Sequence, residues 1–246
     1  MNPWPYPRWI AHRGAGKLAP ENTLAALRLG ASLGYRAFEC DVKLSADGVT
    51  FLLHDATLER TTTGTGLAGE QLWSDLSRLD AGSWHGPPYA GEPITSLDAV
   101  ARFVLGNGYL LNIELKPTPG TDHATGVAVG QACQQLWPAD AVPPLLSSFR
   151  PEALRGARQA APAIPRALLL DETGAGWLAA AQGLGCVAVV LNQTCADHDS
   201  IAQARAVGLK VLVFTVNDAI TAQRLLANGV DGIITDAVDQ MPRDDL

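Results

Sequence analysis

The chain has 246 residues and a net charge of −7, and 47% of its residues are hydrophobic. This is enough apolar material for a full core, and α/β barrels of roughly 250 residues often fold as one unit. Because nucleic-acid binding rests on Lys and Arg neutralising phosphates, the acidic balance argues against a nucleic-acid partner. It does not exclude an anionic small molecule, provided that positive charge is concentrated locally.

The N-terminal segment has no apolar core of a signal peptide, and the longest apolar runs are far too short to span a bilayer. We therefore expect a cytoplasmic protein without stable membrane insertion. For its oligomeric state we expect either a monomer or a homodimer. Four cysteines occur without a Cys-x-x-Cys pair, in or near apolar stretches. This pattern favours buried reduced thiols over disulfides or a zinc site.

The first sixty residues predict three strands and one helix: strands at Trp9–Ala11, Ala37–Val42 and Val49–Leu53, and a helix at Asn22–Leu33. Asp47-Gly48, between the second and third strands, is a hairpin turn signal. Residues 60–95 are rich in Thr, Gly and Pro and contain one short helical piece at Trp73–Leu79. We interpret them as a small insertion within a single domain that covers residues 1–246.

From about residue 105 onward, short apolar runs alternate with Ala-rich stretches of helical period. The predicted strands are Tyr109–Leu115, Leu145–Phe149, Arg166–Leu170, Val187–Asn192, Val211–Val216 and Gly232–Thr235. The predicted helices are Thr125–Leu136, Pro151–Gln159, Gly176–Gln182, Asp197–Ala206 and Ala219–Ala227. Such alternation is typical of parallel strands covered on both faces. About eight main strands in this length predict an α/β fold, a (β/α)8 TIM-type barrel with a small insertion between early barrel elements, and a doubly wound open sheet is the alternative.

Polar residues follow the apolar strands at four places, where a barrel carries its catalytic groups. In chain order these are His12-Arg13, Glu39-x-Asp41, His54-Asp55 and Glu114-x-Lys116. Since residues i and i+2 of a strand point to the same face, each of the two spaced doublets projects together. Three converging carboxylates, Glu39, Asp41 and Glu114, would repel one another, and a hard divalent cation resolves that repulsion. We therefore predict a site for one Mg²⁺ or Ca²⁺ ion, with Mn²⁺ also possible.

The charges around this cluster indicate its substrate. With the cation and the two positive residues Arg13 and Lys116, the cluster keeps a small positive charge that suits a phosphodiester monoanion. The planar fork of Arg13 also matches two phosphate oxygens. His12 and His54, at different strand ends, fit general acid–base work, in which one ring takes the proton of the attacking oxygen and the other protonates the leaving oxygen.

Other residues carry weaker signals. Asn22 is predicted first of all as a helix N-cap, with Glu21 in the same turn, and a supporting role in the site is the less favoured interpretation. Phe214 is most simply a core aromatic, although near a strand end it would floor a substrate pocket. Trp84 either lines the mouth or packs it. The remaining histidines are interpreted as ordinary hydrogen-bonded residues: His85, His123 and His198.

The sequence resembles the glycerophosphodiester phosphodiesterases over nearly its whole length. The similar stretches are HRGAGKLAPENTLAAL from His12, FECDVKLSADGVTFLLHDATLERTT at 38–62, NIELKP at 112–117, VFTVN at 213–217 and GVDGIITD at 229–236. LDAGSW at 79–84 and GEPITSLDAV at 91–100 look like that family's small insertion. Phe214 stands where the family often has Trp, and Ala237-Val238-Asp239 lacks the proline that is common in the family after the last strand.

The resemblance implies a TIM-type barrel that cleaves glycerophosphodiesters to sn-glycerol 3-phosphate and an alcohol. It implies a divalent cation on Glu39, Asp41 and Glu114. His12 and His54 would form the acid–base pair, and Arg13 and Lys116 would bind the phosphate, with Phe214 against the glycerol. The resemblance also implies attack by the substrate glycerol's own hydroxyl, which gives a cyclic phosphate that water then opens.

Three alternatives remain open on the sequence. A lysophospholipid phosphodiesterase of the lysophospholipase D type shares the chemistry but needs an apolar groove or a membrane-facing patch. An aldolase-like barrel with a Schiff base on Lys116 leaves the carboxylates and histidines unexplained. A non-catalytic phosphate-binding barrel would bind without turnover, and the intact His12 and His54 argue against it.

Overall fold

The computed structural model describes residues 4–241, in which short buried strands alternate with longer helices. The strands are β1 Trp9–Ala11, β2 Ala37–Leu44, β3 Thr50–Leu52, β4 Leu110–Leu115, β5 Leu145–Ser148, β6 Arg166–Leu170, β7 Ala188–Asn192, β8 Lys210–Phe214 and β9 Gly232–Thr235. The helices are α1 Leu24–Ser32, α2 Trp73–Leu76, α3 Leu97–Gly106, α4 Asp122–Leu136, α5 Pro151–Ala160, α6 Trp177–Gly183, α7 His198–Ala206 and α8 Ala219–Ala227, with short 3-10 turns η1 Ala68–Glu70 and η2 Pro87–Tyr89.

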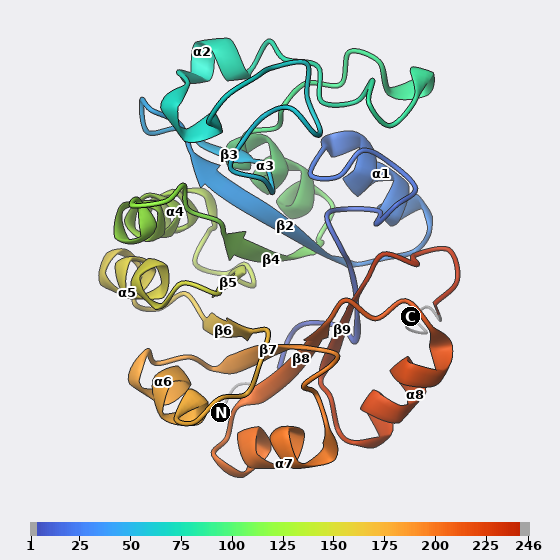
Figure 1. Cartoon of the computed structure of the whole chain (residues 1–246), viewed down its shortest axis with the longest axis vertical. Helices are drawn as coiled ribbons and strands as arrows, with labels where there is room; N and C mark the ends of the chain where they lie inside the picture. Colours follow the sequence, from blue (N-terminus) through green and yellow to red (C-terminus); the bar gives the residue numbers. More distant parts are fainter. Residues whose placement is uncertain (1–3, 242–246) are drawn as a thin grey trace.

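Eight of the strands in residues 4–241 form a closed circle of parallel neighbours. Their order is β1, β9, β8, β7, β6, β5, β4 and β2, and the pairing of Ala11 with Phe38 joins β1 back to β2. Helices surround this circle, as Figure 1 shows. The fold is therefore the predicted (β/α)8 TIM-type barrel, and the closure excludes the doubly wound open sheet.

Alternation along the strands produces two apolar cores and a polar rim. Inward residues such as Ile10, Leu145 and Leu212 fill the barrel interior, and a larger outward layer packs against the helices. On β2 and β4 the inward positions change from apolar to polar toward the C-terminal end. The paired residues there are Ala37 with Leu110, Glu39 with Asn112, and Asp41 with Glu114. The interior is thus filled at its N-terminal end, and the polar groups collect at the mouth.

The third predicted strand does not belong to the barrel circle. β3 runs antiparallel to β2, with Leu52 opposite Val42. The hairpin turn predicted at Asp47-Gly48 is confirmed, and Gly48 has a φ of 86°, which favours glycine. β2 continues to Leu44, past the end of its pairing with β4, so β3 folds back toward the rim. His54 therefore reaches the mouth from the returning strand of a hairpin, and not from the end of a parallel barrel strand.

The segment between β3 and α3 has a small apolar cluster of its own. The segment contains η1, α2 and η2. The cluster joins Phe51 of β3 to buried side chains of the segment, which are Leu53, Leu58, Ala68, Leu76, Ala81 and Ile94. Figure 1 shows the segment above β2 and β3 and beside α1. The helix predicted at Trp73–Leu79 is shorter, ending at Leu76.

Helix α3 was not predicted from the sequence. Its first turn overlaps the stretch GEPITSLDAV, which was assigned to the insertion. Ser96 caps it, with the hydroxyl accepting a hydrogen bond from the Ala99 N–H at 3.2 Å. Buried residues then follow at helical spacing: Leu97, Val100, Ala101 and Val104. The cap at Ser96 and this spacing were the sequence signals for the helix. Helix α3 is one of the outer helices of the barrel.

The structure also bears on the expectations about the cysteines and about membrane-spanning segments. All four cysteines are free, and Cys40, Cys133 and Cys186 are buried. Among the helices of residues 4–241, none combines the length and the hydrophobicity that crossing a bilayer requires.

Candidate active site at the barrel mouth

Three carboxylates meet at the C-terminal end of the barrel. Glu39 and Asp41 come from β2, and Glu114 on β4 lies directly beside Asp41 in the parallel pairing. Each offers one oxygen, and these three oxygens lie within 4.8 Å of one another. All three residues are largely buried, so water screens their repulsion poorly. Their oxygens form a donor set that fits a hard divalent cation.

The pKa values of these carboxyls reflect the crowding. Burial and the charge of Asp41 raise the pKa of Glu39 to about 7 and that of Glu114 to about 8. Burial also opposes ionisation of Asp41, but the charges of Arg13 and Lys116 outweigh it and hold the Asp41 pKa well below its usual range. Near neutral pH the cluster therefore retains protons that a bound cation would displace.

We expect the affinity for Mg²⁺ or Ca²⁺ to rise between about pH 6 and about pH 8. Carboxylate ligands must be deprotonated, and Glu39 and Glu114 keep their protons to about pH 7 and about pH 8. Below these values each displaced proton changes the affinity by about tenfold per pH unit. Calorimetric titrations in buffers of different ionisation enthalpy measure the affinity and the protons released. A constant affinity without proton release would exclude titration of these ligands.

Asn22 contacts Asp41 and does not cap the helix. The N-cap of α1 is Thr23, whose hydroxyl accepts from the Ala26 N–H at 3.2 Å, so the predicted cap at Asn22 is wrong. The Asn22 Nδ2 donates to Asp41 Oδ2 at 2.8 Å, and the Asp41 N–H donates to Asn22 Oδ1 at 3.0 Å. Asn22 has a φ of 61°, a left-handed conformation that Asn tolerates better than most residues. These contacts fit a supporting role of Asn22 in the site, which was the less favoured interpretation of this residue from the sequence.

Two cations border the carboxylates. The Arg13 Nη1 donates to Glu21 Oε1 at 2.8 Å, and its Nε lies 3.3 Å from Asp41 Oδ2. The Arg13 backbone N–H donates to a Glu39 oxygen at 3.1 Å. Lys116 Nζ donates to Glu114 Oε1 at 2.8 Å and lies 3.6 Å from Asp41 Oδ1. The same-face projection predicted for Glu114 and Lys116 is thus confirmed.

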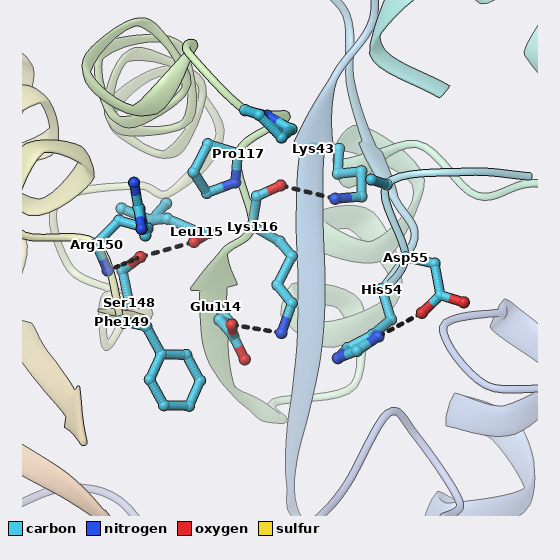
Figure 2. Close-up of a pocket in the computed structure, with 12 residues that line it drawn as sticks. Lys43, His54, Asp55, Glu114, Leu115, Lys116, Pro117, Ser148, Phe149 and Arg150 are labelled. Carbon is cyan, nitrogen blue, oxygen red and sulfur yellow. Dashed lines mark hydrogen bonds and ion pairs between the residues drawn. The ribbon is translucent and has the colours of Figure 1, made fainter. Parts of the chain in front are cut away.

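Each of the two candidate histidines is paired with a carboxylate. His12 Nδ1 lies 2.6 Å from Asp236 Oδ1, and its Nε2 lies 3.8 Å from Glu39 Oε2. His54 Nδ1 lies 2.7 Å from Asp55 Oδ1 (Figure 2). A Nδ1–H donated to the carboxylate leaves Nε2 able to exchange a proton with a ligand.

The surroundings shift the pKa of the two rings in opposite directions. Burial lowers the pKa of His12, but the hydrogen bond to Asp236 and the charge of Glu39 outweigh it, so the pKa is raised. Burial dominates at His54 and lowers its pKa, despite the charge of Asp41. The two histidines therefore differ in proton affinity, as two rings with separate acid and base tasks require.

Several residues of the site were missed in the sequence. Asp236 directly follows β9, so the strand-end rule that found the other groups also applied to it. Arg60 joins Glu21 to Asp55, with Nη1 2.7 Å from Glu21 Oε2 and Nε 2.5 Å from Asp55 Oδ2. It comes from the irregular segment after β3, where no periodic pattern predicts its direction.

Lys43 was also missed, although it continues the alternation of Glu39 and Asp41 on β2. Its Nζ donates to the backbone oxygen of Lys116 at 3.0 Å. Burial lowers the pKa of Lys43 to about 8, so most of the amine is protonated at neutral pH. The i+2 spacing that defined the carboxylate doublet was the signal for it.

Two open cavities flank the carboxylates. One, of about 420 Å³, is lined by residues that include Lys43, His54, Lys116, Phe149 and Arg150 (Figure 2). The other, of about 340 Å³, lies on the β1 side, and its lining includes His12, Arg13, Glu21, Arg60, Trp84 and Asp236. Trp84 therefore lines the mouth.

Phe214 is the last residue of β8 and packs against the inward core at the barrel mouth. It lines a small space of about 20 Å³ together with His12, Glu39 and Glu114, and its ring packs edge-on against Phe149 with centroids 5.7 Å apart. The three other histidines have ordinary hydrogen-bond partners: His85 with Lys17 O, His123 with Gln159 and His198 with Asp199.

Comparisons with known proteins identify the family. The model of the glycerophosphoryl diester phosphodiesterase family matches residues 12–240. A putative glycerophosphodiester phosphodiesterase of Bacillus subtilis, YhdW, is 33% identical over 96% of both chains. A glycerophosphodiester phosphodiesterase of Caldanaerobacter subterraneus subsp. tengcongensis is 32% identical over 92% of this chain and 93% of its own.

A solved structure is similar as well. An Oleispira antarctica phosphodiesterase, in complex with the product sn-glycerol-3-phosphate, superimposes with a TM-score of 0.91 at 37% identity, over 96% of this chain and 95% of its own. The chain thus belongs to the glycerophosphoryl diester phosphodiesterase family. It is an enzyme of that family, a glycerophosphodiester phosphodiesterase, and hence a phosphoric diester hydrolase.

Proposed function

We propose that this enzyme is a metal-dependent hydrolase that releases sn-glycerol 3-phosphate and an alcohol from glycerophosphodiesters. The observation that carries the metal is the meeting of Glu39, Asp41 and Glu114 within 4.8 Å in a poorly screened site. These residues would hold one divalent cation, Mg²⁺ or Ca²⁺, with Mn²⁺ as a further candidate. A cation bound there supplies positive charge where the phosphate becomes more negative in the transition state.

Arg13 and Lys116 bind the phosphate in this proposal. Both side chains point into the carboxylate cluster, and both are cations with N–H groups that phosphate oxygens can accept from. Glu21 and Asn22 are positioning residues, since Glu21 holds the Arg13 guanidinium and Asn22 holds Asp41. Phe214 lies inside the mouth at the end of β8, where its ring can contact the carbon atoms of the glycerol.

His12 and His54 are the proposed acid–base pair. The glycerol hydroxyl attacks phosphorus as the bond from phosphorus to the alcohol oxygen breaks, which gives a cyclic glycerol phosphate. One histidine takes the hydroxyl proton and the other protonates the leaving oxygen. Water then opens the ring with the roles reversed. The contacts to Asp236 and Asp55 support these tasks because they fix the orientation of each ring.

The structure favours this proposal over the alternatives left open by the sequence. Burial lowers the pKa of Lys116, but the charges of Asp41 and Glu114 outweigh the effect of burial, so the pKa is raised. The amine therefore stays protonated, which makes Lys116 a poor Schiff-base candidate. A lysophospholipid needs a long apolar groove, whereas the cavities of about 420 and 340 Å³ beside the carboxylates carry charged side chains. Small glycerophosphodiesters fit better, and we propose a cytoplasmic monomer or homodimer acting on them.

The test is release of sn-glycerol 3-phosphate from a panel of glycerophosphodiesters by the purified enzyme. We expect EDTA to abolish release, because Glu39, Asp41 and Glu114 then lack their cation, and Mg²⁺, Ca²⁺ or Mn²⁺ to restore it. Dialysis after EDTA, followed by addition of K⁺ alone, is the control for ionic strength. Undiminished turnover in EDTA, with the metal content shown to be zero, would contradict the metal proposal.

A further inference from the structure

Lys43 is a buried lysine to which the proposed reaction gives no task. It is 1% exposed and takes the inward position on β2 after Glu39 and Asp41. Its Nζ donates one hydrogen bond, to Lys116 O, and forms no salt bridge with the residues that the structure describes. An ammonium group has three N–H donors, and buried donors without acceptors cost free energy. Two N–H donors of Lys43 therefore lack an acceptor among the described residues, and Lys43 belongs to the lining of the cavity of about 420 Å³.

The charges around this cavity indicate which chemical groups of a ligand find partners in it. Lys43, Lys116 and Arg150 are positive and line the same space (Figure 2). Lys116 Nζ donates to Glu114 Oε1 and Arg150 Nε donates to Asp122 Oδ1, whereas Lys43 Nζ, among the residues that the structure describes, is paired with no carboxylate. The carboxylates in the lining are engaged, Asp55 by His54 and Arg60, and Glu114 by Lys116. Hydroxyl or anionic oxygens are therefore the groups that find partners here.

A quaternary ammonium group, in contrast, finds no suitable partner among these residues. Such cations bind over open aromatic faces or beside free carboxylates. Phe149 is the aromatic ring in the lining, and Lys116 Nζ already lies 5.7 Å from its centroid. A choline group at this place would meet ammonium and guanidinium groups and lose its own hydration.

The position of the cavity indicates which arm of the substrate enters it. Phe214, the proposed contact of the glycerol, lines the same small space as His12 and Glu39. Lys43 and His54 lie in the cavity of about 420 Å³ that also contains Lys116, the proposed phosphate contact. A substrate with its glycerol over Phe214 and its phosphate against Lys116 therefore extends its alcohol toward Lys43.

We propose that Lys43 is a specificity-determining residue that donates hydrogen bonds to the alcohol part of the substrate. The enzyme then prefers glycerophosphodiesters whose alcohol is a polyol, such as glycerol or inositol, over those of choline. This inference rests on the proposed function and adds the class of alcohol to it.

The test compares kcat/KM of the wild type and Lys43→Met on diesters that share glycerol phosphate and differ in the alcohol. We expect the variant to lose about 10- to 100-fold on glycerophosphoglycerol and glycerophosphoinositol, the effect of a lost hydrogen bond from a charged donor. On glycerophosphocholine we expect a change within about threefold, because choline accepts no bond from Lys43. The ratio of variant to wild type for each substrate cancels differences in alcohol reactivity and in the amount of folded enzyme.

Two further variants guard against a purely structural effect. Lys43→Arg keeps the charge and should retain the preference for polyols, and Lys43→Gln should lose it as Lys43→Met does. Inhibition by the product sn-glycerol 3-phosphate should be unchanged in all three, since the product lacks the alcohol. Equal losses on every diester, or product inhibition weakened by the same factor, would overturn the proposal. A wild type that releases no sn-glycerol 3-phosphate from any diester would instead contradict the proposed function.

Discussion

Replacing Asp41 by Asn is expected to lower kcat/KM on glycerophosphodiesters by about 1000-fold. In the proposed function the cation stabilises the transition state by several kcal/mol, and loss of one ligand charge would weaken its binding; each 1.4 kcal/mol or so is tenfold in rate. The same substitution removes the carboxylate that Arg13, Lys116 and Asn22 face, so the two proposed phosphate contacts, Arg13 and Lys116, would also lose their alignment. Activity assays with parallel calorimetric titration of Mg²⁺ separate the two effects.

The matched control for Asp41→Asn is Asp199→Asn on α7. The Asp199 side chain is 86% exposed, so the same chemical change there should leave activity within about twofold. Wild-type affinity for Mg²⁺ in Asp41→Asn would remove Asp41 from the proposed donor set. Full activity on saturating Mg²⁺ would show that the residue acts only through cation affinity.

Substituting His12 by Ala is expected to lower kcat by about 100- to 10,000-fold, the usual contribution of a general acid or base. Affinity for Mg²⁺ should stay within about threefold, because His12 contributes no oxygen to the carboxylate cluster. His123→Ala is the control, since that ring lies on α4 and bonds to Gln159. A His12→Ala enzyme with wild-type kcat would contradict the acid–base assignment.

The pairing of His12 with Asp236 adds a pH-dependent test of the same assignment. Asp236 stabilises the protonated ring, so Asp236→Asn should lower the pKa of His12 and move that limb of the pH–rate profile to lower pH. The loss of kcat should be smaller than in His12→Ala, about 10- to 100-fold, as for other residues that orient a catalytic ring. An unshifted profile would restrict Asp236 to a structural role.

The sequence predicted the parts of the site that depend on local periodicity. Alternation of two residues placed Glu39 with Asp41 and Glu114 with Lys116, and strand–helix alternation predicted the barrel that brings the doublets together. The apolar runs were long enough, and the Gly and Pro positions clear enough, to locate every barrel strand. The predicted roles of these residues, and the division into one domain with an insertion at 60–95, stay predictions.

The parts that the sequence did not predict depend on contacts between distant segments. His12 and Asp236 are 224 positions apart, and only closure of the barrel joins their strands. The sequence does not predict the backbone bend at Asn22. The capping rule assigns the N-cap to Asn22, whereas Thr23, which satisfies the same rule one position later, is the actual N-cap. Helix α3 was not predicted because its first turn overlaps a stretch that resembles the family's insertion.

The antiparallel strand β3 has a consequence for how this enzyme can change. His54 is carried by a hairpin whose tip, Asp47-Gly48, lies beyond the barrel and away from the carboxylates. Lengthening the tip disturbs the hydrogen bond from the Trp73 N–H to Asp47 Oδ1, but we expect it to leave the pairing of β2 with β3 intact, and with it the position of His54. One residue added within β3, in contrast, would reverse which face each later side chain points to. The tip is therefore the part of the hairpin that evolution, or an inserted label, can alter without moving His54.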